Sequence, residues 1–128
     1  MIYLLDVSTL IALLWQRHDQ HDRVKTWELN SEVAVCPITE LGFLRIITQP
    51  AFGATMDEAR HILGQWIYAK EPHHISCDLP LLKGAPAPTS GKTTDFYLAS
   101  LAEKHGMKFA TLDENIKHPA AFLIPLLS

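Results

Sequence analysis

Short apolar runs alternate along the chain with longer stretches in which apolar residues recur every three or four positions. Runs of the first kind predict buried strands, and stretches of the second kind predict amphipathic helices. Strands are expected at residues 2–5, 33–36, 73–77 and 108–112, with a weaker fifth run at 121–126. Helices are expected from Ser8 or Thr9 to Trp15, over 23–29, over 38–48, from Thr55 or Asp57 through Ile67, and over 93–105.

Residue types at the helix ends support these bounds. Pro37 suits the first position of a helix, and Gly106 suits the position that follows one. Thr93 and Thr94 are the candidate caps of the last helix. The segment 78–92, which precedes them, is rich in proline and glycine and predicts a long, exposed and mobile loop.

Strands that alternate with helices favour an α/β fold, with a central parallel sheet of four to five strands and helices on both faces. In such sheets the ligand crevice lies beyond the carboxyl ends of the strands. A functional site is therefore expected among the residues that directly follow strands and at the helix starts that face them.

The composition fits one globular domain spanning residues 1–128, with 48% apolar and 20% charged residues. The net charge of −3 means that local basic groups, metal ions or single-strand contacts must hold any nucleic-acid partner. Cys36 and Cys77 are expected to be buried thiols in a reducing compartment. No uncharged apolar run approaches the length needed to cross a bilayer, so a cytoplasmic protein with no membrane contact is expected.

Four acidic residues stand where apolar residues would be expected. Asp6 ends the first predicted strand, and Asp113 follows the fourth. Glu40 and Asp95 lie in the opening turns of two helices, on faces that otherwise look buried. Several carboxylates that converge on one crevice raise one another's pKa unless a cation neutralises them. The set predicts a site for Mg²⁺ (or Mn²⁺), in which the cation activates water for phosphodiester hydrolysis.

Each acid taken alone also has a structural interpretation. Asp95 can offset the dipole of its helix, and Asp113 can cap the turn that it begins. Glu40 can pair with Arg45. Asp6 is the hardest to explain structurally, because it interrupts an apolar run with no turn residue beside it.

The same acids carry a resemblance to PIN-domain ribonucleases. The segments 4–13, 38–45, 94–102 and 111–113 resemble, in order, the four acidic motifs of VapC-type toxins from bacterial toxin–antitoxin pairs. Ser8 stands where many relatives have asparagine or threonine, and its hydroxyl can still orient metal-bound water. Thr111 is the hydroxyl residue two positions before the fourth acid.

The resemblance implies a PIN-like three-layer α/β/α fold and an endoribonuclease that depends on Mg²⁺ or Mn²⁺. It implies that the metal-binding, catalytic residues are Asp6, Glu40, Asp95 and Asp113. It also implies RNA as the substrate, homodimerisation, and inhibition by a small VapB-like antitoxin that binds across the active site.

Two basic residues are candidates for contact with a substrate phosphate, Arg45 and Lys92. Lys92 lies in Gly91–Lys92–Thr93, but Pro86 stands where a P-loop needs glycine, which excludes a nucleotide site of that kind. His73 and His74 fall on opposite faces of a predicted strand, which disfavours a shared zinc site.

Two other functions remain as alternatives. A non-catalytic PIN-like module that binds RNA or protein would be expected to lack one or more of the acids, and this chain has all four. A phosphoryl-transfer α/β domain with Asp6 as nucleophile ranks lower, because haloacid-dehalogenase-like enzymes need a second acid where this chain has Ser8. Metal-dependent RNA cleavage that Asp6→Asn abolishes separates the nuclease from both.

Overall fold

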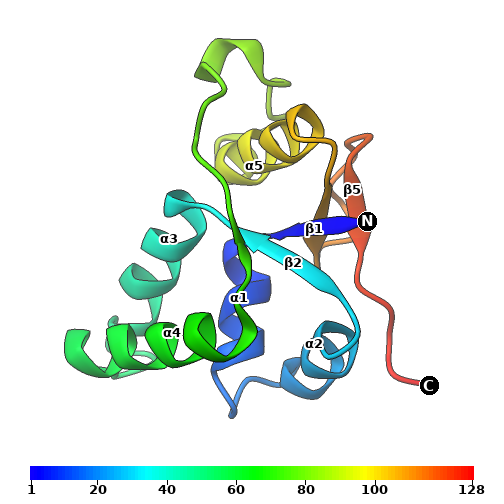
Figure 1. Cartoon of the computed structure of the whole chain (residues 1–128). Coiled ribbons are helices and arrows are strands. Elements are labelled where there is room, and N and C mark those ends of the chain that lie inside the picture. The colour runs from blue at the N-terminus through cyan, green and yellow to red at the C-terminus, as the bar shows by residue number, and fades with distance from the viewer.

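The centre of the molecule is a five-stranded, all-parallel sheet in a computed structural model that describes residues 1–128 (Figure 1). The strands lie side by side in the order β3-β2-β1-β4-β5. Their bounds are β1 (Ile2–Leu5), β2 (Glu32–Val35), β3 (His73–His74), β4 (Lys108–Thr111) and β5 (Ala121–Leu123). The helices are α1 (Val7–Leu14), α2 (His21–Glu28), α3 (Pro37–Ile47), α4 (Met56–Lys70) and α5 (Thr93–Lys104).

Alternate residues of the strands face two separate cores. Leu5, Val35 and Ala110 belong to the larger core, which the helices α1 to α4 cover. Leu4 and Phe109 belong to the smaller core on the opposite face, beneath α5. Figure 1 shows α5 on one side of the sheet and the other four helices on the other side. The expected three-layer α/β/α fold with a parallel sheet is confirmed.

The helix ends follow local chemistry, with two corrections to the predicted caps. Thr55 and Glu58 form a reciprocal capping box at the start of α4, as a threonine three residues before a glutamate favours. At α1, however, Asp6 is the cap, so the prediction of Ser8 or Thr9 is wrong. At α5 the predicted threonine caps lie inside the helix, and no side chain caps its first turn.

The third strand is shorter than predicted. Only His73 and His74 pair with β2, and the N–H of Ile75 donates the last bond to the sheet, to Val35 O at 3.0 Å. The chain then leaves this edge of the sheet, where no further strand pairs with it. Cys77 is consequently exposed, so only Cys36 is the buried thiol that the sequence predicts for both.

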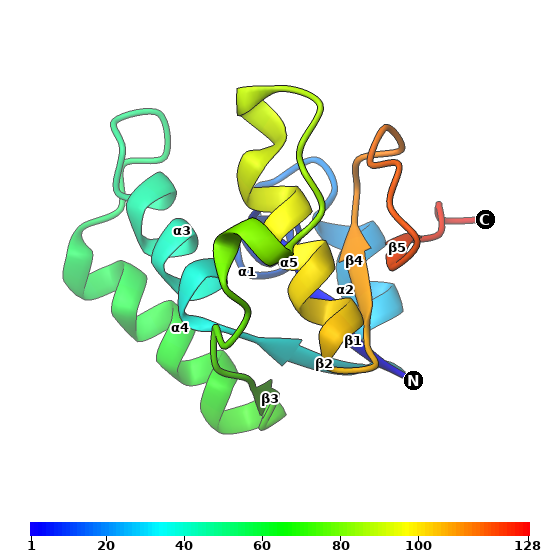
Figure 2. The ribbon, with the colours of Figure 1, turned by 90° about the horizontal axis from the view of Figure 1, so that it is seen from above.

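The segment 78–92 is exposed but fastened along α5, which argues against a freely mobile loop. Asp78 Oδ1 lies 2.8 Å from Nε2 of His105. The Tyr97 hydroxyl donates to Leu79 O at 2.8 Å, and the N–H of Ala85 donates to a side-chain oxygen of α5 at 2.9 Å. Single 3-10 turns at Leu81–Lys83 and Ser90–Lys92 shape it further. Figure 2 shows the segment passing beside α5.

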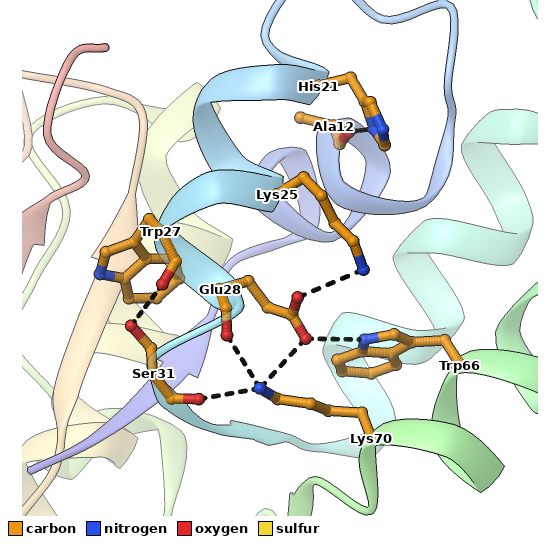
Figure 3. A network of polar contacts seen from close by, with 8 residues as sticks. All are labelled: Ala12, His21, Lys25, Trp27, Glu28, Ser31, Trp66 and Lys70. Carbon is orange, nitrogen blue, oxygen red and sulfur yellow. Dashed lines mark hydrogen bonds and ion pairs between the residues drawn. The ribbon is translucent and has the colours of Figure 1, made fainter. Parts of the chain in front are cut away.

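Helices α2 and α4 are joined by a buried glutamate that the sequence analysis did not single out. The carboxylate of Glu28 lies 3.5 Å from Nζ of Lys25 and 3.3 Å from Nζ of Lys70, and accepts a bond from Trp66 Nε1 at 3.4 Å (Figure 3). Lys70 Nζ also donates to the carbonyls of Glu28 and Ser31.

No helix of the structure combines the length and apolarity that spanning a bilayer requires.

Candidate active site

Asp6 follows β1 and is almost fully buried, with 3% of its surface exposed. Its Oδ1 accepts the N–H of Thr9 at 2.5 Å, and its own N–H donates to Ala110 O in the neighbouring strand β4. Burial raises the pKa of Asp6 to about 6, against the lowering effect of hydrogen bonds from Thr9 and Thr111; the charge of Asp95 raises it further. Asp6 is thus a buried acid with hydrogen-bond donors but no cationic partner.

Asp95 lies in the first turn of α5, is half-buried, and interacts electrostatically with Asp6 and Asp113. Burial raises its pKa, the ammonium of Lys92 lowers it, and the charge of Asp113 raises it. Because Asp95 also raises the pKa of Asp6, three of the four predicted acids influence one another. Like charges brought together in this way favour the uptake of a cation.

Asp113 lies two residues beyond β4 and is held by its neighbours. Its Oδ2 accepts a hydrogen bond from Lys92 Nζ, and its Oδ1 accepts the N–H of Asn115 at 2.9 Å. The Lys92 contact is the main reason why the pKa of Asp113 lies below its usual range. The bond to Asn115 is the turn cap that the sequence suggested, so Asp113 has a structural role in addition to its place beside Asp95.

Glu40 lies in the opening turns of α3, half-buried, and its predicted structural partner is wrong. Its Oε2 lies 3.7 Å from Nε2 of His74, at the end of the edge strand β3. Arg45 is exposed in the last turn of α3 and forms no ion pair. His74 is a site neighbour that the sequence analysis assigned only to a strand. The pairing of β2 with β3 brings it there, which no local pattern indicates.

The position of α3 beside the start of α1 depends on a glycine and a threonine. A Cβ on Gly42 would lie 2.6 Å from a methyl carbon of Val7, so only glycine allows this close approach of the two helices. The buried Thr39 hydroxyl donates to Leu5 O at 3.0 Å. These contacts fix the helix that carries Glu40 directly against the end of β1.

The two hydroxyl residues predicted to support the acids, Ser8 and Thr111, differ in burial and in their contacts. Thr111 is buried, lowers the pKa of Asp6 by hydrogen bonding, and accepts the N–H of Asp113 at 3.0 Å. Ser8 is exposed in α1, and the neighbouring Thr9 is the residue that contacts Asp6. The spacing of a helix cap, in which the third residue on donates its N–H, could have identified Thr9.

The acids of this edge fit a hard divalent cation in chemistry, although they are not closed around one point. Their oxygen atoms are the donors that Mg²⁺ and Mn²⁺ prefer. No group of three or more histidine, cysteine, aspartate or glutamate side chains is arranged to hold a metal ion. Two of the acids, Glu40 and Asp113, are instead turned toward His74 and Lys92. Metal binding by all four acids would therefore require these two contacts to loosen.

Comparison with known proteins gives one consistent family. The PIN domain family model matches residues 3–121. The chain is 33% identical to Ribonuclease VapC38 of Mycobacterium tuberculosis over 88% of this chain and 86% of that protein. It is 32% identical to Ribonuclease VapC29 of the same species over 98% of each chain.

Solved structures give the same fold at lower sequence identity. VapBC2 from Rickettsia felis bound to a DNA fragment from their promoter matches with a TM-score of 0.64 and 13% identity, over 96% of this chain and 97% of that one. FitAB bound to an IR36 DNA fragment matches with a TM-score of 0.62 and 19% identity, over 88% and 85%. At these identities the likeness establishes the fold alone.

Proposed function

The chain belongs to the PIN-domain family and, within it, to the VapC ribonucleases, and from that membership we propose that it is an endoribonuclease toxin that hydrolyses RNA phosphodiester bonds with the help of Mg²⁺ or Mn²⁺. The observation that carries the proposal is Asp6. It is buried at the carboxyl end of β1, has a raised pKa, and lies within electrostatic reach of Asp95. A fold of this kind binds ligands at that end of its sheet.

In the proposed site Asp6 and Asp95 hold the cation, and Glu40 and Asp113 complete its ligands. A bound divalent cation supplies Lewis-acid activation of water and stabilises charge on the phosphate. Thr9 donates its N–H to one oxygen of Asp6, which fixes the direction in which the other oxygen points.

Lys92 forms an ion pair with Asp113 at the proposed site. It is half-buried, its pKa is raised chiefly by Asp113, and the charge of Asp95 raises it further. A lysine whose pKa is raised in this way stays protonated, so it is suited to contact the substrate phosphate beside the acids. Arg45, which is exposed at the far end of α3, is the weaker candidate for this contact.

The partners proposed for this chain are RNA as substrate and a small VapB-like antitoxin as inhibitor. The structural neighbours VapBC2 and FitAB support the second partner, because they belong to the same fold and their names describe complexes. A homodimer and a cytoplasmic location are also proposed. We further propose that residues 1–128 act as a single domain, of which the family model covers 3–121.

The proposal is tested by incubating purified, antitoxin-free protein with total cellular RNA in Mg²⁺, in Mn²⁺ and in chelator. Cleavage that requires the metal and is lost in Asp95→Asn supports the nuclease. Glu103→Gln is the matched control, because Glu103 is an exposed acid of the same helix and forms no ion pair. Folded protein that cleaves no RNA and binds no divalent cation would favour a binding module.

A further inference from the structure

Two adjoining pockets lie between the fastened segment 78–92 and the first turns of α5. Their volumes are about 360 Å³ and 280 Å³, and Leu81, Thr93 and Tyr97 line both. Together they reach the size of a small-ligand site. One pocket opens toward Ile38 at the start of α3, and the other lies under the proline-rich part of the segment.

The walls of these pockets are held in place without a ligand. The Tyr97 hydroxyl donates to Leu79 O, and the N–H of Ala85 donates to the buried Ser100 hydroxyl. The Thr93 hydroxyl donates to Ser90 O at 2.8 Å. Because these bonds fix the segment on α5, a ligand would not have to order it first.

The chemistry of the lining selects a neutral ligand. No charged residue lines either pocket, whereas apolar side chains alternate with the hydroxyl groups of Thr89, Ser90, Thr93 and Thr94. A phosphate would lose its water without gaining a cation here. A planar group with hydrogen-bonding edges would instead meet an aromatic ring, at Tyr97, and several hydroxyl groups.

The smaller pocket lies next to the helix starts that carry two of the proposed catalytic acids. Thr94, in the wall of the smaller pocket, directly precedes Asp95, and Ile38, in the same wall, lies two residues before Glu40. A group bound here would therefore lie beside the helix starts that carry Asp95 and Glu40. We propose that the two pockets form a subsite for an unpaired nucleobase next to the scissile phosphate. This inference rests on the proposed ribonuclease function.

The test compares two adjacent leucines. Leu81 lines both pockets, whereas Leu82 lines neither and is 95% exposed. Leu81→Trp fills the subsite, and Leu82→Trp adds the same bulk outside it. Each variant and the native protein are given a pool of short single-stranded RNAs of random sequence with Mn²⁺, and the cleaved ends are sequenced. Circular dichroism and Mn²⁺ affinity are measured on the same samples.

We expect Leu81→Trp to flatten the nucleotide preference beside the cut and to lower cleavage of the preferred sequences about tenfold, the scale of one stacked base. Leu82→Trp should match the native protein, and Mn²⁺ affinity should be unchanged in both. Thr94→Val, which keeps the shape and removes a hydroxyl, should change the preference and lower cleavage of the preferred sequences, by less than Leu81→Trp does.

Three results would overturn the inference. If the native preference persists in both Leu81→Trp and Thr94→Val, the subsite is not where the base binds, although the ribonuclease stands. If Leu81→Trp leaves cleavage unaffected but lowers the affinity for the antitoxin, the pocket binds the antitoxin and not a nucleobase. If the native protein cleaves none of the RNAs and binds no Mn²⁺, the proposed function fails and the inference fails with it.

Discussion

Two buried carboxylates, at opposite ends of the parallel strands, are surrounded in opposite ways. Asp6 is 3% exposed beyond the carboxyl end of β1, and Glu28 is 2% exposed before the amino end of β2. Glu28 has the ammonium groups of Lys25 and Lys70 within 3.5 Å and an indole N–H beside them (Figure 3). Asp6 has hydrogen bonds from threonines, and the charge that acts on its pKa is the negative one of Asp95.

Burial of an acid therefore does not by itself mark a functional site. Glu28 is compensated inside the protein, and its network joins α2 to α4. Asp6 is not compensated, so its charged form is unfavourable until something positive binds. The difference in cation partners, rather than in burial, separates the structural acid from the proposed catalytic one.

The largest expected effect is on RNA cleavage. Asp6→Asn and Asp95→Asn should each lower the cleavage rate at least about a hundredfold, because each removes a proposed metal ligand worth several kcal/mol. Glu28→Gln should retain the native rate wherever it is folded. Initial rates on a fluorescent RNA check this. Loss of cleavage in folded Glu28→Gln would contradict the assignment of Glu28 to a purely structural role.

The two acids should also have opposite effects on stability in the absence of metal. The pKa of Asp6 is about 6 in the folded protein and 3.8 for an unburied aspartate, a difference that corresponds to about 3 kcal/mol. Between pH 3.8 and about 6 the folded protein keeps the Asp6 proton, whereas the unfolded chain has released it. Stability from Asp6 is thus present below about pH 4 and lost as the pH rises through 6.

At pH 7 Asp6→Asn should therefore raise the free energy of unfolding by up to about 3 kcal/mol, since asparagine also caps a helix. Glu28→Gln should lower it by about 2 to 3 kcal/mol, because two lysines lose their counter-charge while Lys70 keeps two carbonyl acceptors. Urea unfolding in chelator measures both. Destabilisation by both variants alike would contradict the contrast.

The affinity for metal should depend on pH, because Asp6 must release its proton before it can bind a cation. A cation needs the deprotonated carboxylate, so affinity for Mn²⁺ should fall by about tenfold per pH unit below about 6. Calorimetric titration of the native protein and of Glu28→Gln should give the same profile. A profile that is flat between pH 5 and 7 would mean that Asp6 is not a ligand.

The smallest effect concerns the two hydroxyl residues that follow Asp6. The buried Thr9 hydroxyl donates to Ala110 O at 3.3 Å, whereas Ser8 is exposed. Thr9→Val should cost about 1 kcal/mol of stability, and Ser8→Ala should stay within about 0.5 kcal/mol of the native protein. Thermal unfolding at pH 7 checks the pair. Equal effects would show that the hydrogen bond from the Thr9 hydroxyl to Ala110 O does not contribute to stability.

The sheet and most helices could be predicted because their patterns are local. The apolar run at 2–5 and the stripe of α4 specify element type without knowledge of neighbours. The side-chain contacts at the two ends of the strands could not be predicted from local patterns. His74 reaches Glu40 through the pairing of β2 with β3, and Glu28 meets Lys70 across 42 residues of sequence. Contacts between distant segments depend on tertiary packing.

The N-terminal cap of α1 was predicted wrongly for a different reason. Asp6 looked unexplained because it stands inside an apolar run, yet it caps the helix that begins at the next residue. Capping and metal binding are compatible, since the N–H of Thr9 uses only one carboxylate oxygen. A single residue can thus start a helix and still offer the acid that the site requires.

The most direct test of the catalytic role of Asp6 is Mn²⁺-dependent cleavage of total RNA by the native protein, Asp6→Asn and Glu28→Gln, at a temperature where all three are folded. We expect the native protein and Glu28→Gln to cleave RNA, and Asp6→Asn not to cleave it although it is the most stable of the three in chelator. Full cleavage by Asp6→Asn would contradict this expectation, because the buried acid without a cation partner would then have no part in the chemistry.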